Sequence, residues 1–258
     1  MELALTSDRC NKPRLVCPPK PLRGGHRLTT VRRNLGALAG RMKAILFDLD
    51  ETLLDRKQSL IAFVSNQAKS LVADSEIDRF IQRFIELDSN GSVWKDIVYS
   101  KLVDEFGLVG VNSDFLLNDY VDNFHKFCIA KPGAKEAVAS LHGNGFLIGL
   151  VSNGKTPFQE RAFDALDLSN LFSTILVSEA VGYRKPDPDI FNLACNNLGV
   201  LPSETIFVGD NPIADIEGAK AVGMYTIYIP GFYGPDCIDS DAVCNDFHDL
   251  SRLVQNAC

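Results

Sequence analysis

Two aspartates, Asp48 and Asp50, end the first hydrophobic run of the sequence, in the segment FDLDET. In an extended strand, side chains two residues apart point to the same side, so the two carboxylates would repel each other. A single pair of this kind is explained most simply by a turn that one aspartate caps while the other is solvated. The pair indicates chemistry only if other polar groups converge on it.

Such groups follow three later hydrophobic runs. They are Ser152, Asn153 and Gly154 after the second run, Lys185 after the third, and Asp210 and Asp215 after the fourth. Carboxylate oxygens in this number suit a hard cation such as Mg²⁺ (magnesium). A hydroxyl, main-chain amides and an ammonium suit the oxygens of a phosphate group. If they converge, these residues predict metal-assisted chemistry on a phosphorylated substrate.

The elements that must position these groups are short apolar runs that alternate with helical patterns. Strands are expected at 44–47, 146–151, 174–177, 205–208 and 225–229. Helices are expected to start near Pro132, Pro157, Pro188 and Pro212, because proline fits the first turn of a helix. The pattern is typical of an α/β fold, a doubly wound, Rossmann-like parallel sheet covered by helices. In such a sheet all the groups named above lie at the carboxyl edge, where ligands bind.

About a hundred residues between the first two strands contain four amphipathic helical segments and no convincing strand. Helical spacing is clearest at Ile77, Phe80, Ile81 and Phe84 and at Leu117, Tyr120, Val121 and Phe124. We expect an α-helical cap domain at 57–128, inserted into a core domain formed by 42–56 and 129–258. The cap would emerge beside the carboxyl edge and act as a lid.

Within the cap, the segment 88–95 is the candidate for contact with the leaving group of a substrate. The only tryptophan, Trp94, follows this segment's turn and could stack on a substrate. We expect it instead to pack on Ile97 and Val98 of the following helix.

The four motifs, in this order and spacing, resemble those of the haloacid dehalogenase (HAD) superfamily. The sequence is similar to phosphatase-type members with a helical, C1-type cap, of the phosphoglycolate phosphatase-like subfamily IA. The resemblance covers residues 42 to about 235. It implies an Mg²⁺-dependent phosphatase that hydrolyses a small phosphomonoester through an aspartyl-phosphate intermediate.

The resemblance also implies a role for each motif residue. Asp48 is the nucleophile, Asp50 is the general acid and base, and Lys185 neutralises the nucleophile and the phosphoryl group. Substrate-binding residues are Thr52, which also helps to hold Asp50, together with Ser152, Asn153, Gly154 and Lys185. The metal ligands are Asp48, Asp210 and Asp215 through their side chains and Asp50 through its main-chain carbonyl.

The residue at position 50 distinguishes among related chemistries. Dehalogenases of the superfamily lack this second aspartate, because a halide leaves without a proton, so Asp50 argues against dehalogenation. A sugar phosphomutase shares every core motif and is the alternative reading. A non-enzymatic phospho-Asp receiver or a silent binding protein is opposed by the helical insertion and by the filled catalytic positions.

Charge is distributed unevenly along the 258 residues, whose net charge is −7. Residues 1–41 hold nine basic and two acidic side chains, a charge of +7, whereas the remaining 217 hold 17 basic and 31 acidic ones, a charge of −14. An acidic body argues against a nucleic-acid or anionic-membrane surface. We therefore expect a small phosphorylated metabolite as the partner, no nucleic acid and no membrane; the sequence leaves the oligomeric state open.

The basic segment 1–41 is rich in proline, lacks periodicity and is expected to be disordered. We favour the reading that it precedes the natural initiator Met42; an organelle transit peptide and a basic arm are the alternatives. The seven cysteines are scattered without a C-x-x-C pair, which indicates neither a disulfide framework nor a zinc site. A reducing, cytoplasmic location is the expectation, with organelle import through the extension as the alternative.

Overall fold

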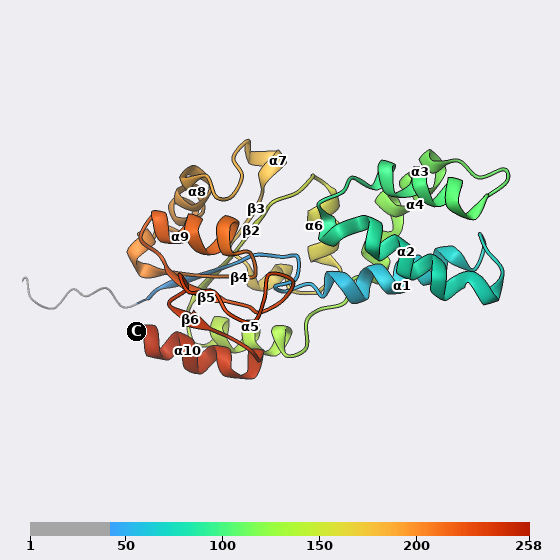
Figure 1. The fold of residues 1–258 in the computed structure, drawn as a ribbon. Helices are drawn as coiled ribbons and strands as arrows, with labels where there is room; N and C mark the ends of the chain where they lie inside the picture. The colour runs from blue at the N-terminus through green and yellow to red at the C-terminus, as the bar shows by residue number, and fades with distance from the viewer. Residues whose placement is uncertain (1–41) are drawn as a thin grey trace, which may run out of the picture. The chain divides into compact units, whose positions relative to one another are not determined.

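The computed structural model describes residues 42–258, and the expectations for 1–41 lie outside the described residues. Within this range all six strands form one parallel sheet in the order β3-β2-β1-β4-β5-β6 (Figure 1). They are β1 (Ala44–Phe47), β2 (Leu147–Ser152), β3 (Thr174–Val177), β4 (Thr205–Gly209), β5 (Tyr225–Tyr228) and β6 (Ala242–Val243). The chain winds outward from β1 in one direction and then in the other, so the predicted doubly wound α/β class is confirmed.

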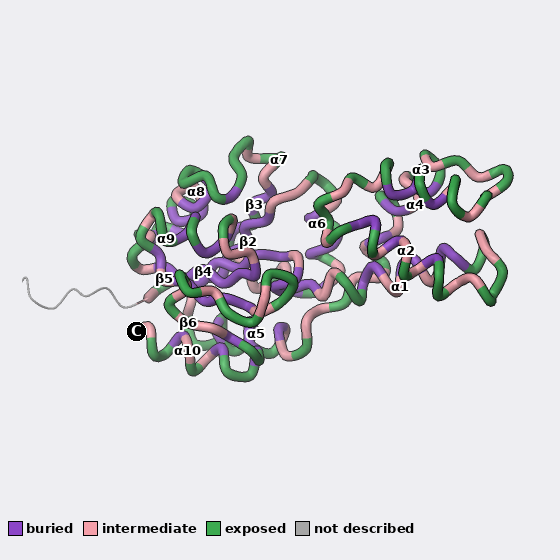
Figure 2. The backbone as a smooth tube through the Cα atoms, in the orientation of Figure 1, coloured by how far each residue is buried: buried purple, intermediate pink, exposed green. Residues whose placement is uncertain are grey.

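Alternate residues of the central strand enter two different hydrophobic clusters. Ile45 and Phe47 belong to one cluster, and Ala44 and Leu46 belong to the other. Helices α5 (Ala134–Gly143) and α10 (Leu250–Ala257) cover one face, and α8 (Pro188–Leu198) and α9 (Gly218–Ala221) cover the other (Figure 1). Every residue of the central strands β1 and β4 is therefore buried (Figure 2), which explains their continuous apolar sequence.

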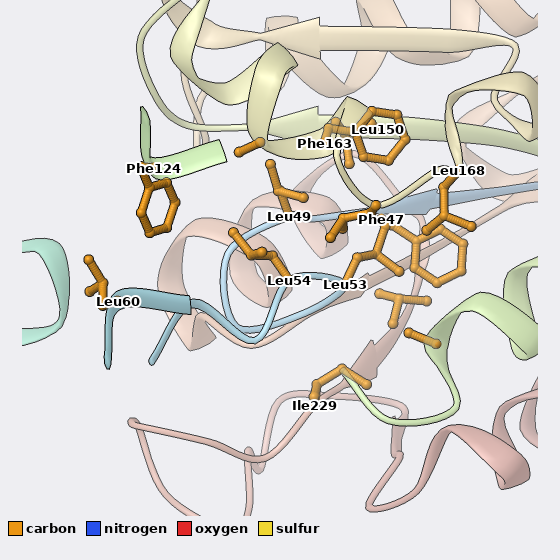
Figure 3. Close-up of a cluster of buried hydrophobic side chains, with 14 of the residues drawn as sticks. Phe47, Leu49, Leu53, Leu54, Leu60, Phe124, Leu150, Phe163, Leu168 and Ile229 are labelled. Atoms are coloured by element: carbon orange, nitrogen blue, oxygen red, sulfur yellow. The ribbon is translucent and has the colours of Figure 1, made fainter. Parts of the chain in front are cut away.

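The larger cluster extends from the sheet into the helices that follow β1. Figure 3 shows Leu49, Leu53 and Leu54 of the loop after β1 between Phe47 of the strand and Leu60 of α1 (Arg56–Ala68). All five of these side chains are at most 1% exposed. Burial of each contributes about 1.5–3 kcal/mol, so the loop that carries the two aspartates is anchored on its apolar side.

The segment between β1 and β2 is helical, and no strand lies within the described residues 48–146. Its elements before α5 are α1, η1 (Asp74–Glu76), α2 (Ile77–Asp88), η2 (Ser89–Gly91), α3 (Lys95–Phe106), α4 (Ser113–Asn123) and η3 (Phe124–Phe127). The predicted apolar faces are buried at Phe80, Phe84, Tyr120 and Phe124, but Val121 is 41% exposed. Val121 was expected on the packed face; the buried stripe of α4 instead runs through Leu116 and Tyr120, one turn apart. The division into cap and core domains stays a prediction.

The two connections between this helical segment and the rest of the fold run side by side. Leu54 pairs with Ala130 as an isolated antiparallel bridge. The main-chain N–H of Asp55 donates a hydrogen bond of 2.8 Å to the carbonyl of Ile129. The chain therefore leaves and re-enters the fold at one place.

Glu51 joins both connections through its side chain. It has a left-handed backbone conformation, with φ of 59°, which residues with a Cβ seldom adopt. Its Oε1 accepts a hydrogen bond of 2.8 Å from the main-chain N–H of Lys57, and its Oε2 lies 2.6 Å from Nζ of Lys131. The turn after Asp50 is thus tied to the first turn of α1 and to the returning chain.

The remaining short elements connect the strands. They are α6 (Phe158–Asp164), η4 (Ser169–Leu171), α7 (Ser178–Val181), η5 (Pro202–Glu204), η6 (Pro212–Glu217) and η7 (Phe247–Asp249). Pro188 begins α8 as predicted, whereas Pro212 begins a π-helical turn instead of an ordinary α-helix. Turns of this kind are frequent at functional sites. Within residues 42–258, no helix has both the length and the apolar character that crossing a membrane requires.

Candidate active site

Three aspartates meet at the carboxyl ends of the neighbouring strands β1 and β4. Asp48 follows β1, Asp210 follows β4, and Asp215 lies in η6. All three are buried, and one carboxylate oxygen from each lies within 4.8 Å of the others. These are the three side chains predicted as metal ligands, and the sheet brings them together. The side chain of Asp50 is not part of this group, and its contact through the main-chain carbonyl stays a prediction.

Asp215 reaches the other two aspartates because η6 folds tightly over the end of β4. The main-chain N–H of Asn211 donates a hydrogen bond of 3.0 Å to Asp215 Oδ2, and the Asn211 side chain accepts bonds from the main-chain N–H groups of Ile213 and Ala214. A Cβ atom at Gly209 would lie 2.4 Å from Asp215 Oδ2. Position 209 therefore needs glycine for Asp215 to approach.

Lys185 lies between two of the aspartates. Its Nζ is 2.6 Å from Asp48 Oδ1 and 2.6 Å from Asp215 Oδ1, with its side chain 2% exposed. Asn153 holds the main chain of Lys185 from both sides, because its Nδ2 donates to the Lys185 carbonyl (2.9 Å) and its Oδ1 accepts from the Lys185 N–H (2.8 Å). The loop after β2 thus positions the ammonium that pairs with Asp48.

These contacts occupy groups that the sequence analysis assigned to the substrate. The Asn153 side chain is engaged with Lys185, and the N–H of Gly154 donates to Ser178 Oγ at 3.0 Å. Ser152 is 1% exposed and lies at the end of β2. The phosphoryl contacts of Ser152, Asn153 and Gly154 stay predictions.

Electrostatics at this edge favour a bound cation. Burial raises the pKa of Asp48, with Lys185 opposing the rise, and burial together with the charge of Asp48 raises the pKa of Asp210. Burial alone would lower the pKa of Lys185, but Asp215 and Asp48 raise it above its usual value. When all three are ionised, the carboxylates beside one ammonium carry an excess of negative charge. An all-oxygen donor set with that excess fits a hard divalent cation.

Asp50 is held by a residue that the sequence analysis did not single out. The Thr52 hydroxyl is buried and has no hydrogen-bond partner within the described residues, so its expected hold on Asp50 is not formed. Instead, Nε2 of Gln159 donates a 2.8 Å hydrogen bond to Asp50 Oδ2. The only feature of the sequence that could have pointed to Gln159 is its position as a polar residue in the first turn of the helix after Ser152.

Asp88 and Lys95, at the two ends of the segment 88–95, form a partly buried ion cluster with Arg56. Both oxygens of Asp88 accept hydrogen bonds from Arg56, at 2.9 and 3.0 Å, and Lys95 forms an ion pair with the same carboxylate. Burial raises the pKa of Asp88, but its contacts with Arg56 and Lys95 outweigh burial and hold it below its usual value. Arg56 and Lys95 both interact electrostatically with Asp50. The cluster therefore joins three helices close to the proposed acid and base.

Trp94 does not pack as the sequence analysis expected. Its side chain is 62% exposed, and Ile97 is 46% exposed, although Val98 is buried. Trp94 precedes α3 in an extended conformation, which takes its side chain off the buried face of that helix. Nζ of Lys155, from the loop after β2, lies 4.6 Å from the centre of the indole ring. This cation–π contact connects the helical segment with the loop that follows Ser152.

Comparisons with known proteins agree with this geometry. Residues 45–229 match the model of the haloacid dehalogenase-like hydrolases. A glyceraldehyde 3-phosphate phosphatase of Pyrococcus furiosus is 28% identical over 195 residues, 73% of this chain and 80% of the relative. A phosphoglycolate phosphatase of Salmonella typhimurium is 27% identical over 236 residues, 81% of this chain and 91% of the relative.

A solved structure supports the fold. The magnesium-bound HAD-hydrolase YfnB of Bacillus subtilis superposes with a TM-score of 0.67, over 83% of this chain and 99% of that chain. The two sequences are 21% identical, so this likeness speaks for the fold alone.

Proposed function

The chain belongs to the haloacid dehalogenase-like hydrolase family, and from this premise we propose that it is an Mg²⁺-dependent phosphatase acting on a small phosphomonoester. The observation that carries the proposal is the placement of Lys185 Nζ 2.6 Å from both Asp48 and Asp215, beside Asp210. A carboxylate nucleophile that attacks a phosphate must be screened from a negatively charged target. This arrangement supplies the screening at the nucleophile itself.

The residues support a reaction in two steps. Asp48 attacks the phosphorus atom and forms an aspartyl phosphate, while Asp50 gives a proton to the departing alcohol. Asp50 then accepts a proton from the water that hydrolyses the aspartyl phosphate. Lys185 stays paired with Asp48 and neutralises charge on the phosphoryl oxygens in both steps.

Asp48, Asp210 and Asp215 would hold the Mg²⁺ ion, together with the main-chain carbonyl of Asp50. When bound, the ion supplies the positive charge that screens the nucleophile and polarises the phosphoryl group. The proposal is supported by the buried, all-carboxylate donor set and its excess negative charge.

The substrate is proposed to be a small phosphorylated metabolite. The two relatives described above carry the names of phosphatases for a three-carbon and a two-carbon phosphate. In this chain, Arg56 and Lys95, which pair with Asp88, also interact electrostatically with Asp50, the residue proposed to give its proton to the leaving group. We propose that this cluster contacts the leaving group. Rates with phosphoglycolate, glyceraldehyde 3-phosphate, hexose phosphates and nucleoside monophosphates would identify the class.

The decisive experiment measures phosphate release from p-nitrophenyl phosphate with and without Mg²⁺. The wild type should be active only with the metal, and Asp48→Asn should lose essentially all turnover because an amide cannot attack phosphorus. The matched control is Asp122→Asn, which changes an exposed carboxylate on α4 and should leave turnover unaltered.

Two outcomes would refute the phosphatase proposal: no phosphate release by the wild type on any substrate of the panel, or full activity in Asp48→Asn. The phosphomutase alternative is tested with hexose phosphates in the same panel. Formation of an isomeric sugar phosphate without release of inorganic phosphate would favour the mutase.

A further inference from the structure

Gln159 connects two functional residues through one buried amide group. It lies in the first turn of α6 and is 3% exposed. Its Nε2 donates to Asp50 Oδ2 at 2.8 Å and to Ser152 Oγ at 3.0 Å, with a longer contact of 3.4 Å to the main-chain oxygen of Asn153. A buried amide is retained at such a position only when its hydrogen bonds are satisfied.

Within residues 42–258, no other group forms a hydrogen bond with the carboxylate of Asp50. The amide of Gln159 binds Oδ2, and Oδ1 is without a partner among the described residues. A carboxylate on a short side chain can rotate about two bonds and reach several staggered orientations. The hydrogen bond from Gln159 selects one of them and leaves Oδ1 available for proton transfer.

The backbone around Gln159 is shaped to admit its side chain. A Cβ atom at Gly154 would lie 2.4 Å from Cγ and 2.8 Å from Cδ of Gln159. Contacts this short do not occur in folded proteins, so any larger residue at position 154 would displace Gln159. The N–H of Gly154 is bonded to Ser178, which fixes the loop in this position. Gly154 therefore serves the approach of Gln159 to Asp50.

We propose that Gln159 is a positioning residue that aims the carboxylate of Asp50 at the reacting oxygen in both steps. This inference rests on the proposed function. In the first step a bond forms between Asp48 and phosphorus, the bond from phosphorus to the leaving oxygen breaks, and the proton of Asp50 passes to that oxygen. In the second step water bonds to phosphorus, the bond to Asp48 breaks, and a proton of the water returns to Asp50. Gln159 exchanges no atom in either step.

The two steps depend unequally on Asp50 when the leaving group is p-nitrophenolate. This weakly basic phenolate departs without a proton, so the aspartyl phosphate can form even when Asp50 is misaligned. Water must still lose a proton to attack the aspartyl phosphate, and that step needs Asp50 in place. Loss of Gln159 should therefore slow the second step much more than the first.

The experiment follows p-nitrophenolate release by stopped flow in the full-length protein with Mg²⁺. Gln159→Met keeps the length of the side chain and removes the amide. We expect the steady-state rate to fall about tenfold or more, because small displacements of catalytic groups have effects of that size. A rapid release of one equivalent of p-nitrophenolate per enzyme should precede this slow phase, with a first step close to the wild-type rate, and KM should not rise.

A second variant and a matched control distinguish loss of the Gln159 amide from general damage to the protein. Gln159→Glu retains the shape of the side chain but turns a carboxylate toward Asp50, and it should show the same selective loss of the second step. Gln67→Met removes another buried amide, whose Nε2 donates a 2.8 Å hydrogen bond to Asp119 in the helical segment. It should leave both phases unchanged.

The inference is overturned if the steady-state rate of Gln159→Met stays within about twofold of the wild type. It is also overturned if the rapid and steady phases of folded Gln159→Met and Gln159→Glu decline in equal proportion, because that result indicates general damage to the site. Refutation of the phosphatase proposal gives a different result, because the wild type itself would then release no phosphate.

Discussion

Asp48 and Asp210 are buried beside each other, so protons and the proposed Mg²⁺ ion would compete for the same oxygens. The raised pKa of each carboxyl means that it keeps its proton to a higher pH than an exposed aspartate does. Binding of a metal requires the ionised form. Mg²⁺ affinity should therefore increase as the pH rises through the raised pKa values, by up to about tenfold per pH unit for each proton displaced.

The same shifts predict how the metal-free protein responds to pH. Ionising a carboxyl whose pKa is raised by folding costs stability, so the metal-free protein should lose stability as the pH rises, and Mg²⁺ should restore it. Titration calorimetry and thermal unfolding between pH 5.5 and 8.5 would check both trends. In Asp210→Asn one titrating group is removed, and the pH dependence should flatten; an affinity for Mg²⁺ that is independent of pH would contradict the prediction.

Among the site residues, the sequence predicted the aspartates that lie together at the ends of strands. Asp48, Asp210 and Asp215 follow apolar runs, and the rule that ligands bind at the carboxyl edge brings them together. Gln159 was missed because its function depends on a three-dimensional contact with Asp50 across 109 positions of sequence. Thr52 was assigned to hold Asp50, but its hydroxyl makes no such bond here.

Among the secondary-structure elements, Asp88 is the residue that ties α1, α2 and α3 together. It is 2% exposed and pairs with Arg56 of α1 and Lys95 of α3. Asp88→Asn would leave two largely buried cations, each 11% exposed, without their counter-ion, which should destabilise the protein by about 3 kcal/mol. Denaturant unfolding at pH 7 would measure the loss. Asp104→Asn, on the exposed side of α3, is the control and should change stability little.

The pH dependence expected of this ion cluster has the opposite sign to that expected of Asp48 and Asp210. Folding lowers the pKa of Asp88, so its contribution is complete above the unfolded value near 3.8 and is lost as the pH falls through the lowered value. The stability difference between wild type and Asp88→Asn should therefore shrink in acid. A difference that stays constant down to pH 2 would show that the charge of Asp88 contributes nothing.

The elements themselves were predicted well wherever local sequence decides the structure. The expected central strands match the observed ones to within a residue or two at each end, because residues buried on both faces give continuous apolar runs. The two-residue strand β6 is too short to leave such a pattern. The π-helical turn at Pro212 depends on capping by Asn211 and on the hydrogen bond from Asn211 to Asp215. Neither contact can be predicted from hydrophobic periodicity.

For the whole molecule, every residue assigned to the chemistry lies between positions 48 and 215 of the described part. A protein that starts at Met42 should therefore keep its Mg²⁺-dependent phosphatase activity. Comparing kcat/KM for p-nitrophenyl phosphate between residues 42–258 and the full chain would test this expectation. A large loss in the shorter protein, with unchanged thermal stability, would assign the basic segment a part in catalysis.

The pairing of Leu54 with Ala130 bears on how such a molecule can change its substrate during evolution. Since the chain departs from and returns to the sheet at adjacent points, the intervening helices can be exchanged for a different insert without altering the register of any strand. The aspartates and Lys185 belong to the sheet side of that junction, whereas the cluster around Asp88 belongs to the insert. On the roles proposed for them, reaction chemistry and choice of leaving group can thus be inherited separately.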